Sequence, residues 1–146
     1  MRRHGLARAA SLALASALAG CQRGSGPPGG CDLARGPCAA AEGGIAFRLE
    51  LTPRPPRPLS ELEASLALSS GGAPLEEAEV ALALEMPGMY MGENRFALRP
   101  LGGGRYRGKV VLVRCLSGRR DWVAEVTARL RDGRVARARF PFEVAE

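Results

Sequence analysis

Residues 121–144 read DWVAEVTARLRDGRVARARFPFEV, and this stretch decides how the chain folds. On both sides of Asp132-Gly133, apolar residues alternate with polar or charged ones, which predicts two antiparallel strands joined by a tight turn. A hairpin with one apolar face is only marginally stable by itself. The pattern therefore predicts a larger sheet structure whose other strands cover this face.

The length of the turn sets the register, because a slip of one residue moves every side chain to the opposite face. A two-residue loop would place Arg139 on the core face, opposite Val126. A three-residue loop, Arg131-Asp132-Gly133, instead pairs Trp122 with Phe142 and buries both rings. We therefore expect the longer loop, with its glycine in the left-handed bulge position. Arg139 then points to solvent.

Five further strand segments precede the hairpin, and the first four repeat the same period of two. In the first, Ile45, Phe47 and Leu49 share one face, while Arg48 and Glu50 point the other way. The last is a continuous apolar run, which predicts a strand buried on both faces. The five segments are residues 45–52, 62–68, 78–86, 96–98 and 105–115. Seven short strands separated by turn residues predict an all-β fold, an immunoglobulin-like antiparallel β-sandwich.

The first twenty residues have the features of a bacterial lipoprotein signal peptide. A basic start and an apolar run too short to span a bilayer lead into Leu18-Ala19-Gly20 before Cys21. The alternative is an ordinary secretory cleavage site with an incidental cysteine. We expect Cys21 to be acylated and to anchor the protein in the cell envelope, facing the periplasm. Gln22 stands where an aspartate is associated with inner-membrane retention, so the outer membrane is favoured.

Residues 22–44 are rich in Gly, Pro and Ala and lack an apolar period, which predicts a flexible linker. The predicted organisation is therefore a signal peptide at 1–20, the lipidated cysteine and linker at 21–44, and the β-sandwich domain at 45–146.

The residues that are missing exclude whole classes of chemistry. The single histidine, His4, lies in the leader. The mature chain can therefore form neither a Ser-His or Cys-His nucleophile pair nor a His-ligated zinc or copper(II) site. We expect no enzymatic activity.

The net charge of +6 falls to +3 when Arg2, Arg3 and Arg8 leave with the leader. An exported protein does not normally meet nucleic acid, so no nucleic-acid partner is expected.

One motif resembles a phosphate-binding loop but lacks two of its parts. Gly103 to Lys109 matches G-x-x-x-x-G-K, yet Val110 follows where the magnesium ligand Ser or Thr is needed. A strand is predicted next, where the mechanism needs a helix N-terminus. We expect no nucleotide to bind, and we interpret the glycines as a tight hairpin.

Three cysteines remain after Cys21, enough for one internal disulfide in an oxidising compartment. A Cys31–Cys38 bridge would close a short loop inside the predicted linker and stabilise little. A Cys38–Cys115 bridge would tie the entry of the domain to a late strand, a loop worth about 4–5 kcal/mol in the chain-entropy model. We expect Cys38–Cys115. With the shorter bridge, Cys115 would be a free thiol and a soft metal ligand.

Three of the four methionines lie in EMPGMYMGENR, residues 85–95. Thioethers suit Cu(I) and need no deprotonation. The spacing of Met86, Met89 and Met91 around a Pro-Gly turn would let them converge on one ion. Against this, Met86 continues the inward face of the strand at 78–86, and methionine is a common core residue. A Cu(I) site and ordinary packing remain the alternatives.

The segments EMPGMYMGENRFAL, GGGRYRGKVVLVRC and SGRRDWVAEVTARL resemble the YtkA-like/FixH-like family of exported β-sandwich domains. The resemblance covers roughly residues 45–144. By position, the three methionines match the methionine turn of the family, Tyr106 and Gly108 the middle strand, and Trp122 the last motif. The resemblance implies a domain near copper-handling or cytochrome-oxidase assembly proteins. Copper-handling relatives usually add histidines, which the mature chain lacks. For this chain the resemblance therefore implies only a thioether Cu(I) site, helped by Cys115.

Two functional hypotheses follow. The first is a non-catalytic, membrane-anchored accessory or interaction module of the envelope, linked to copper handling or respiratory-complex assembly, with a protein partner that the sequence does not name. The alternative is a Cu(I) carrier that uses the Met-rich loop.

Overall fold

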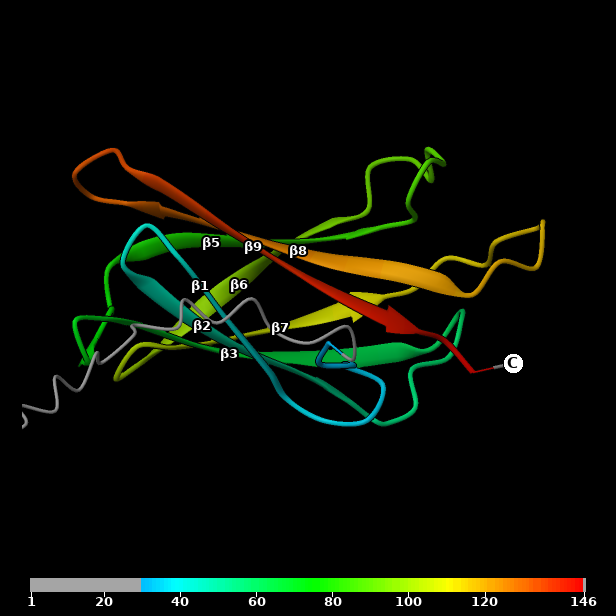
Figure 1. Cartoon of the computed structure of the whole chain (residues 1–146), viewed down its shortest axis with the longest axis horizontal. Coiled ribbons are helices and arrows are strands. Elements are labelled where there is room, and N and C mark those ends of the chain that lie inside the picture. Colours follow the sequence, from blue (N-terminus) through cyan, green and yellow to red (C-terminus); the bar gives the residue numbers. More distant parts are fainter. Residues whose placement is uncertain (1–29, 146) are drawn as a thin grey trace, which may run out of the picture.

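The structure is a computed structural model that describes residues 30–145. These residues form antiparallel strands joined by turns and loops. They include no helix long and apolar enough to cross a membrane. The predicted signal peptide and Cys21 lie outside the described residues. The strands are β1 (Cys38–Glu42), β2 (Ile45–Thr52), β3 (Glu61–Ser70), β4 (Ala73–Pro74), β5 (Ala78–Glu85), β6 (Arg95–Gly102), β7 (Arg105–Val111), β8 (Asp121–Leu130) and β9 (Val135–Glu143) (Figure 1).

The strands form two facing layers, which confirms the predicted β-sandwich (Figure 1). The hydrogen-bonded order is β1-β2-β3-β7-β6-β5-β8-β9, with the short β4 beside β3. β6 pairs with β5 over its first half and with β7 over its second, so it passes from one layer to the other. The outer strands β1 and β9 lie against each other. The Arg137 backbone N–H there donates to the Glu42 carboxylate, so the sandwich is nearly closed along this side.

The β8–β9 hairpin has the register that the sequence predicts. Trp122 pairs with Phe142, and both side chains are buried. Leu130 N–H donates to the Arg134 carbonyl at 2.9 Å, which closes a three-residue loop, and Gly133 has a φ of 85°. Arg139 is exposed to solvent.

The core is built from alternate residues of the two layers, with Trp122, Tyr106 and Phe47 among its largest fully buried side chains. The Tyr106 hydroxyl donates to the Leu75 carbonyl at 2.8 Å and accepts from Ala78 N–H at 3.2 Å. Burial of the ring raises the pKa of this phenol. The hydroxyl is therefore satisfied inside the domain, as a buried tyrosine requires.

Gly108 lies on β7 beside the first half of β6, where that strand leaves for the other layer. A Cβ at this position would stand 2.7 Å from Leu98 Cδ2 and 2.9 Å from the Ala97 carbonyl oxygen. Only glycine lets β6 and β7 approach this closely, which gives a physical reason for a glycine at this position of β7.

The prediction of a flexible linker up to residue 44 is wrong for its second half. Cys38–Glu42 forms the edge strand β1, which pairs with β2, and Leu33 is fully buried. The segment CAAAE has too little apolar bulk for a strand to be recognised from its sequence, and its backbone pairing with β2 is what makes it one. The folded domain therefore begins near Cys31, and nine residues, 22–30, separate it from Cys21.

The predicted Cys38–Cys115 disulfide is also wrong. Cys31 and Cys38 are joined, with Cα atoms 5.5 Å apart, and Cys115 is a free, buried thiol. Cys38 begins β1, whereas Cys115 follows β7, and β2 and β3 lie between these strands. Three strand spacings of about 4.8 Å exceed the Cα separation of about 7 Å that a disulfide tolerates.

The run at 105–115 is not buried on both faces as predicted. Tyr106 and Val110 point into the core, but Val111 is 40% exposed, and the strand ends there. One face of this antiparallel layer is open to solvent, so β7 has a single buried face.

Candidate metal site

A tight turn after β5 separates the first two methionines of the loop at 86–94. Met89 N–H donates to the Met86 carbonyl at 3.1 Å, and Gly88 has a φ of 73°. Proline followed by a glycine with positive φ is the sequence of a type II turn. The turn reverses the chain immediately after Met86.

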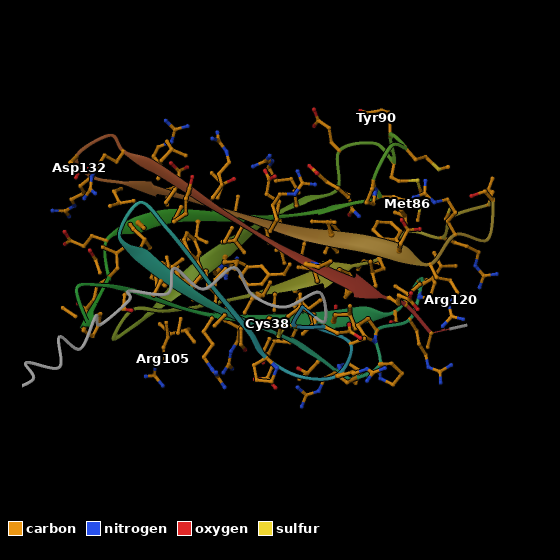
Figure 2. All side chains as sticks on the ribbon, viewed as in Figure 1. Cys38, Met86, Tyr90, Arg105, Arg120 and Asp132 are labelled. Atoms are coloured by element: carbon orange, nitrogen blue, oxygen red, sulfur yellow. A yellow bond between two sulfur atoms is a disulfide. The ribbon has the colours of Figure 1, made fainter. Side chains whose placement is uncertain are left out.

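The three methionines consequently lie in different surroundings. Met86 is 2% exposed and belongs to the core, as the alternation of β5 requires. Met91 is half-buried and packs against the core. Met89 is 37% exposed and lies on the outer side of the turn. Figure 2 shows Met86 close to the body of the sandwich and Tyr90 further out on the same loop.

Cys115 approaches this loop from a second one, residues 112–120, which joins β7 to β8. Gly118 N–H donates to the Cys115 carbonyl at 3.2 Å and closes a turn there. The Cys115 Sγ atom lies 3.8 Å from the Met89 Sδ atom. The fold therefore brings together one thiol and one thioether that the sequence keeps 26 residues apart.

The surroundings of Cys115 favour its thiolate form. Its Sγ atom is 2.9 Å from the Ser117 hydroxyl. This hydrogen bond is the largest cause of a lowered Cys115 pKa, and the Arg119 guanidinium lowers it further. Arg119 itself is held by Asp121, with Nε 3.0 Å from one carboxylate oxygen and Nη2 2.5 Å from the other. Thiolate is the form of cysteine that binds metal ions.

The two sulfur atoms are close enough to hold one ion between them. Two sulfurs that each lie at the metal–thiolate distance of about 2.3 Å found in zinc sites can be up to about 4.6 Å apart. One thiolate and one thioether form a soft donor set, which suits Cu(I). Within residues 30–145, no group of three or more His, Cys, Asp and Glu side chains could hold a metal. By their own chemistry, Met89 and Cys115 are donors for a soft ion.

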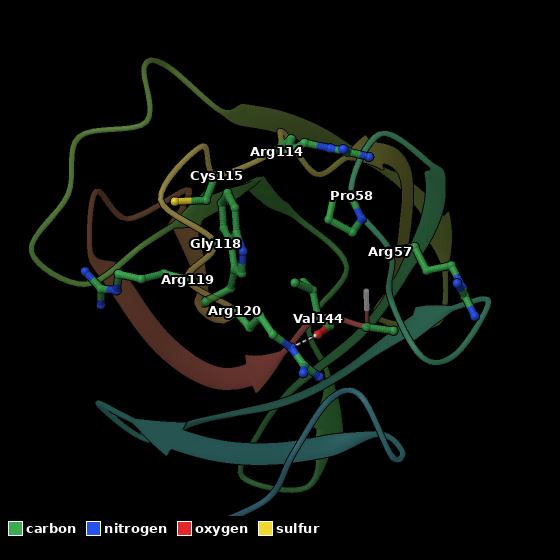
Figure 3. Close-up of a pocket in the computed structure, with 10 residues that line it drawn as sticks. Arg57, Pro58, Arg114, Cys115, Gly118, Arg119, Arg120 and Val144 are labelled. Carbon is green, nitrogen blue, oxygen red and sulfur yellow. Dashed lines mark hydrogen bonds between the residues drawn. The ribbon is translucent and has the colours of Figure 1, made fainter.

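A cleft of about 510 Å³ adjoins the same loop, lined among others by Trp122, Pro58 and Arg114. Figure 3 shows the Cys115 sulfur directed away from Pro58 and Arg57, which line the far side of this cleft. Cys115 also lines the cleft, so the pair of sulfur atoms lies at its edge.

Sequence reasoning identified the loop and only part of the arrangement. It grouped Met86, Met89 and Met91 and named Cys115 as a further ligand, whereas the structure places Met86 in the core and brings Met89 to Cys115. The contact becomes predictable only with the Cys31–Cys38 pairing, which leaves Cys115 free, and with the order of the strands, which brings the ends of β5 and β7 together.

No protein-family model and no curated protein matches the chain. Among solved structures it is similar to the soluble domain of PmoD from Methylocystis sp. ATCC 49242 (Rockwell), with 12% identity and a TM-score of 0.48 over 74% of this chain and 98% of that one. It is also similar to superoxide reductase (neelaredoxin) from Ignicoccus hospitalis, with 14% identity and a TM-score of 0.46 over 68% of this chain and 80% of that one. Values this low say nothing about function, so the site has to be interpreted from its own residues.

Proposed function

We propose that this chain is a non-catalytic accessory protein of the bacterial cell envelope, lipid-anchored through Cys21, with a YtkA-like domain that binds Cu(I) through Met89 and Cys115. The observation that carries the metal part is the 3.8 Å separation of the two sulfur atoms. The lipoprotein signal peptide, with Leu18-Ala19-Gly20 before Cys21, supports the anchor and the periplasmic location.

The chemistry of the two side chains supports Cu(I) over harder ions. The Met89 thioether is neutral at every pH, and the Ser117 hydrogen bond that lowers the pKa of Cys115 favours its charged thiolate form. One negative ligand and one neutral one leave a singly charged cation without net charge at the site. Two protein ligands at a partly exposed position are suited to a site that receives and passes on its ion.

A competition titration of the full mature protein with a chromogenic Cu(I) chelator, under reducing and anaerobic conditions, tests the metal part. We expect one Cu(I) per chain. Met89→Leu and Cys115→Ser should each weaken binding at least about 10-fold, since loss of even an outer-shell partner of a metal ligand costs 10–100-fold. The matched control is Met86→Leu, a change of similar volume in the core, which should leave the affinity unchanged.

Absence of binding tighter than millimolar would contradict the Cu(I) site and leave the accessory module without a metal. Equal affinity in the wild type and the Met89→Leu variant would contradict the assignment of the ligands.

A further inference from the structure

The two ends of the sandwich differ in construction. β2, β5 and β7 run in the same direction, because an antiparallel neighbour separates each from the next. Their carboxyl ends lead into three long loops, 53–60, 86–94 and 112–120, which together form what we term the loop end. The opposite end, the turn end, consists of the connections at 43–44, 71–77, 103–104 and 131–134. Figure 1 shows the two sets at opposite ends of the molecule.

The three loops of the loop end form one continuous surface. Leu59 N–H donates to the Leu112 carbonyl at 2.8 Å, which joins the first loop to the third. The Met89–Cys115 contact joins the second loop to the third. A ligand that covers one of these loops therefore meets the others as well.

Exposed apolar side chains concentrate at the loop end. Leu116 is 97% exposed, Tyr90 is 85% exposed and Leu59 is 65% exposed, each on a different loop. Met89 and Val111 lie at the same end, and among the large hydrophobic side chains exposed in residues 30–145 only Leu101 lies near the turn end. These three side chains project into solvent from separate loops and do not contribute to the core.

The charged residues are also divided unevenly between the loop end and the turn end. The three loops carry five arginines and one glutamate, Glu93, and two of the arginines pair with carboxylates of the adjoining strands, Arg54 with Glu50 and Arg119 with Asp121. The arginines are Arg54, Arg57, Arg114, Arg119 and Arg120. Figure 3 shows Arg57, Arg114 and Arg119 spread around the opening of the cleft, rather than converging on one point. The connections of the turn end carry two arginines and three carboxylates.

The chain also enters the domain on this side. Cys38, the first residue of β1, pairs with Leu49 in the second half of β2, the half that leads to the loop end. A Cβ on Gly36 would lie 4.0 Å from Nη1 of Arg54, a residue of the first loop. Gly30 lies nine positions after the predicted anchor at Cys21, and a chain of that length spans at most about 32 Å in any conformation.

We propose that the loop end is a docking surface for a bilayer that contains anionic phospholipids. Leu116, Tyr90 and Leu59 enter the interfacial region, and basic side chains of the loops, Arg114 among them, bind lipid phosphates. Tyrosine is enriched at membrane interfaces, and basic side chains near an anionic surface each add to binding. The short tether keeps the surface at a high effective concentration near the lipid. This proposal rests on the anchor in the proposed function, and it would place metal exchange at the membrane surface.

Hydrogen–deuterium exchange of the mature lipidated protein in vesicles tests the docking. One set of vesicles contains phosphatidylcholine alone and the other a mixture with phosphatidylglycerol. We expect slower amide exchange in the three loops on the anionic vesicles, no change in the turn end, and loss of the difference at high salt.

Two pairs of variants give matched controls. Arg114→Gln should lower the ratio of docked to undocked protein about fivefold, the contribution of one basic residue near an anionic surface. Arg131→Gln, an exposed arginine of the turn end, should not change the ratio. Leu116→Ser should reduce docking, while Leu101→Ser should not.

Equal exchange in the two lipids, or equal effects of Arg114→Gln and Arg131→Gln, would overturn the proposal and favour an acidic protein as the occupant. Failure of the anchor is detected separately, by an intact mass without acyl chains. Unacylated protein would then be tested for co-sedimentation with the same vesicles. The Cu(I) titration reports on the metal site independently of either result.

Discussion

The Met89 and Cys115 sulfur atoms lie 3.8 Å apart, although 26 residues separate them along the chain. Their approach follows from the strand order, because β5 and β7 run in the same direction with only β6 between them. The turn that begins with Pro87 brings Met89 outward, and the loop after β7 brings Cys115 to it. The strand order thus creates a pair of soft ligands from two ordinary loops.

The disulfide pairing leads to a direct chemical prediction. Peptide mapping without reductant should recover a fragment linked through Cys31 and Cys38, together with Cys115 as a free thiol. Reduction should lower the free energy of unfolding by about 2–3 kcal/mol, the chain-entropy value for so short a loop. A linked fragment that contains Cys115 would refute the assignment and remove the thiol from the site.

Different burial of Met86 and Met89 predicts different costs of truncation. Met86→Ala should lower the free energy of unfolding by about 2–5 kcal/mol, because it opens a cavity in the core. Met89→Ala should change it by about 0.5 kcal/mol or less, as for most surface positions. Chemical denaturation of the metal-free protein measures both. Similar losses in the two variants would show that Met89 is part of the packing.

The pKa of Cys115 should depend on Ser117. The hydrogen bond from Ser117 is the largest cause of the lowered Cys115 pKa, so Ser117→Ala should raise this pKa. The pH profile of the alkylation rate of the Cys115 thiol, measured in a metal-free buffer, should then shift to higher pH. The rate should also fall at neutrality, because the thiolate is the reactive form. Ser65→Ala on β3 is the control, and an unshifted profile in Ser117→Ala would contradict this account of the thiol.

The close approach at Gly108 predicts intolerance of any side chain there. In Gly108→Ala, the new Cβ would meet the Ala97 carbonyl oxygen at 2.9 Å, and backbone cannot move aside as a flexible side chain can. We expect a loss of about 1–3 kcal/mol in the free energy of unfolding, as for overpacked cores. Gly36→Ala, where no heavy atom approaches closer than 4.0 Å, should be nearly neutral. Equal stability of the two variants would argue against the crossing of β6 at this point.

The strong alternation in the sequence predicted most of the sandwich. In the β8–β9 hairpin, burial of Trp122 and Phe142 selected one register, because the other would have buried Arg139. The edge strand β1 was missed, because CAAAE offers little apolar bulk and lies in a stretch rich in glycine and proline. This segment is a strand because it pairs with β2, and the local sequence does not reveal that pairing.

The candidate site could be predicted only in part, for a related reason. The MPGM turn is a local signal, so the exposure of Met89 was within reach of the sequence. The position of Cys115 depends on the order of strands and on which cysteine pairs with Cys38. Both are long-range properties, and two cysteine pairings were compatible with the same spacing.

X-ray absorption at the copper edge of the Cu(I)-loaded protein tests the central claim most directly. We predict a first shell that includes sulfur in the wild type, with one sulfur fewer in Met89→Leu and in Cys115→Ser, and no change in Met86→Leu. A first shell of nitrogen and oxygen alone, or a sulfur count that neither ligand variant lowers, would contradict a site built from these two loops.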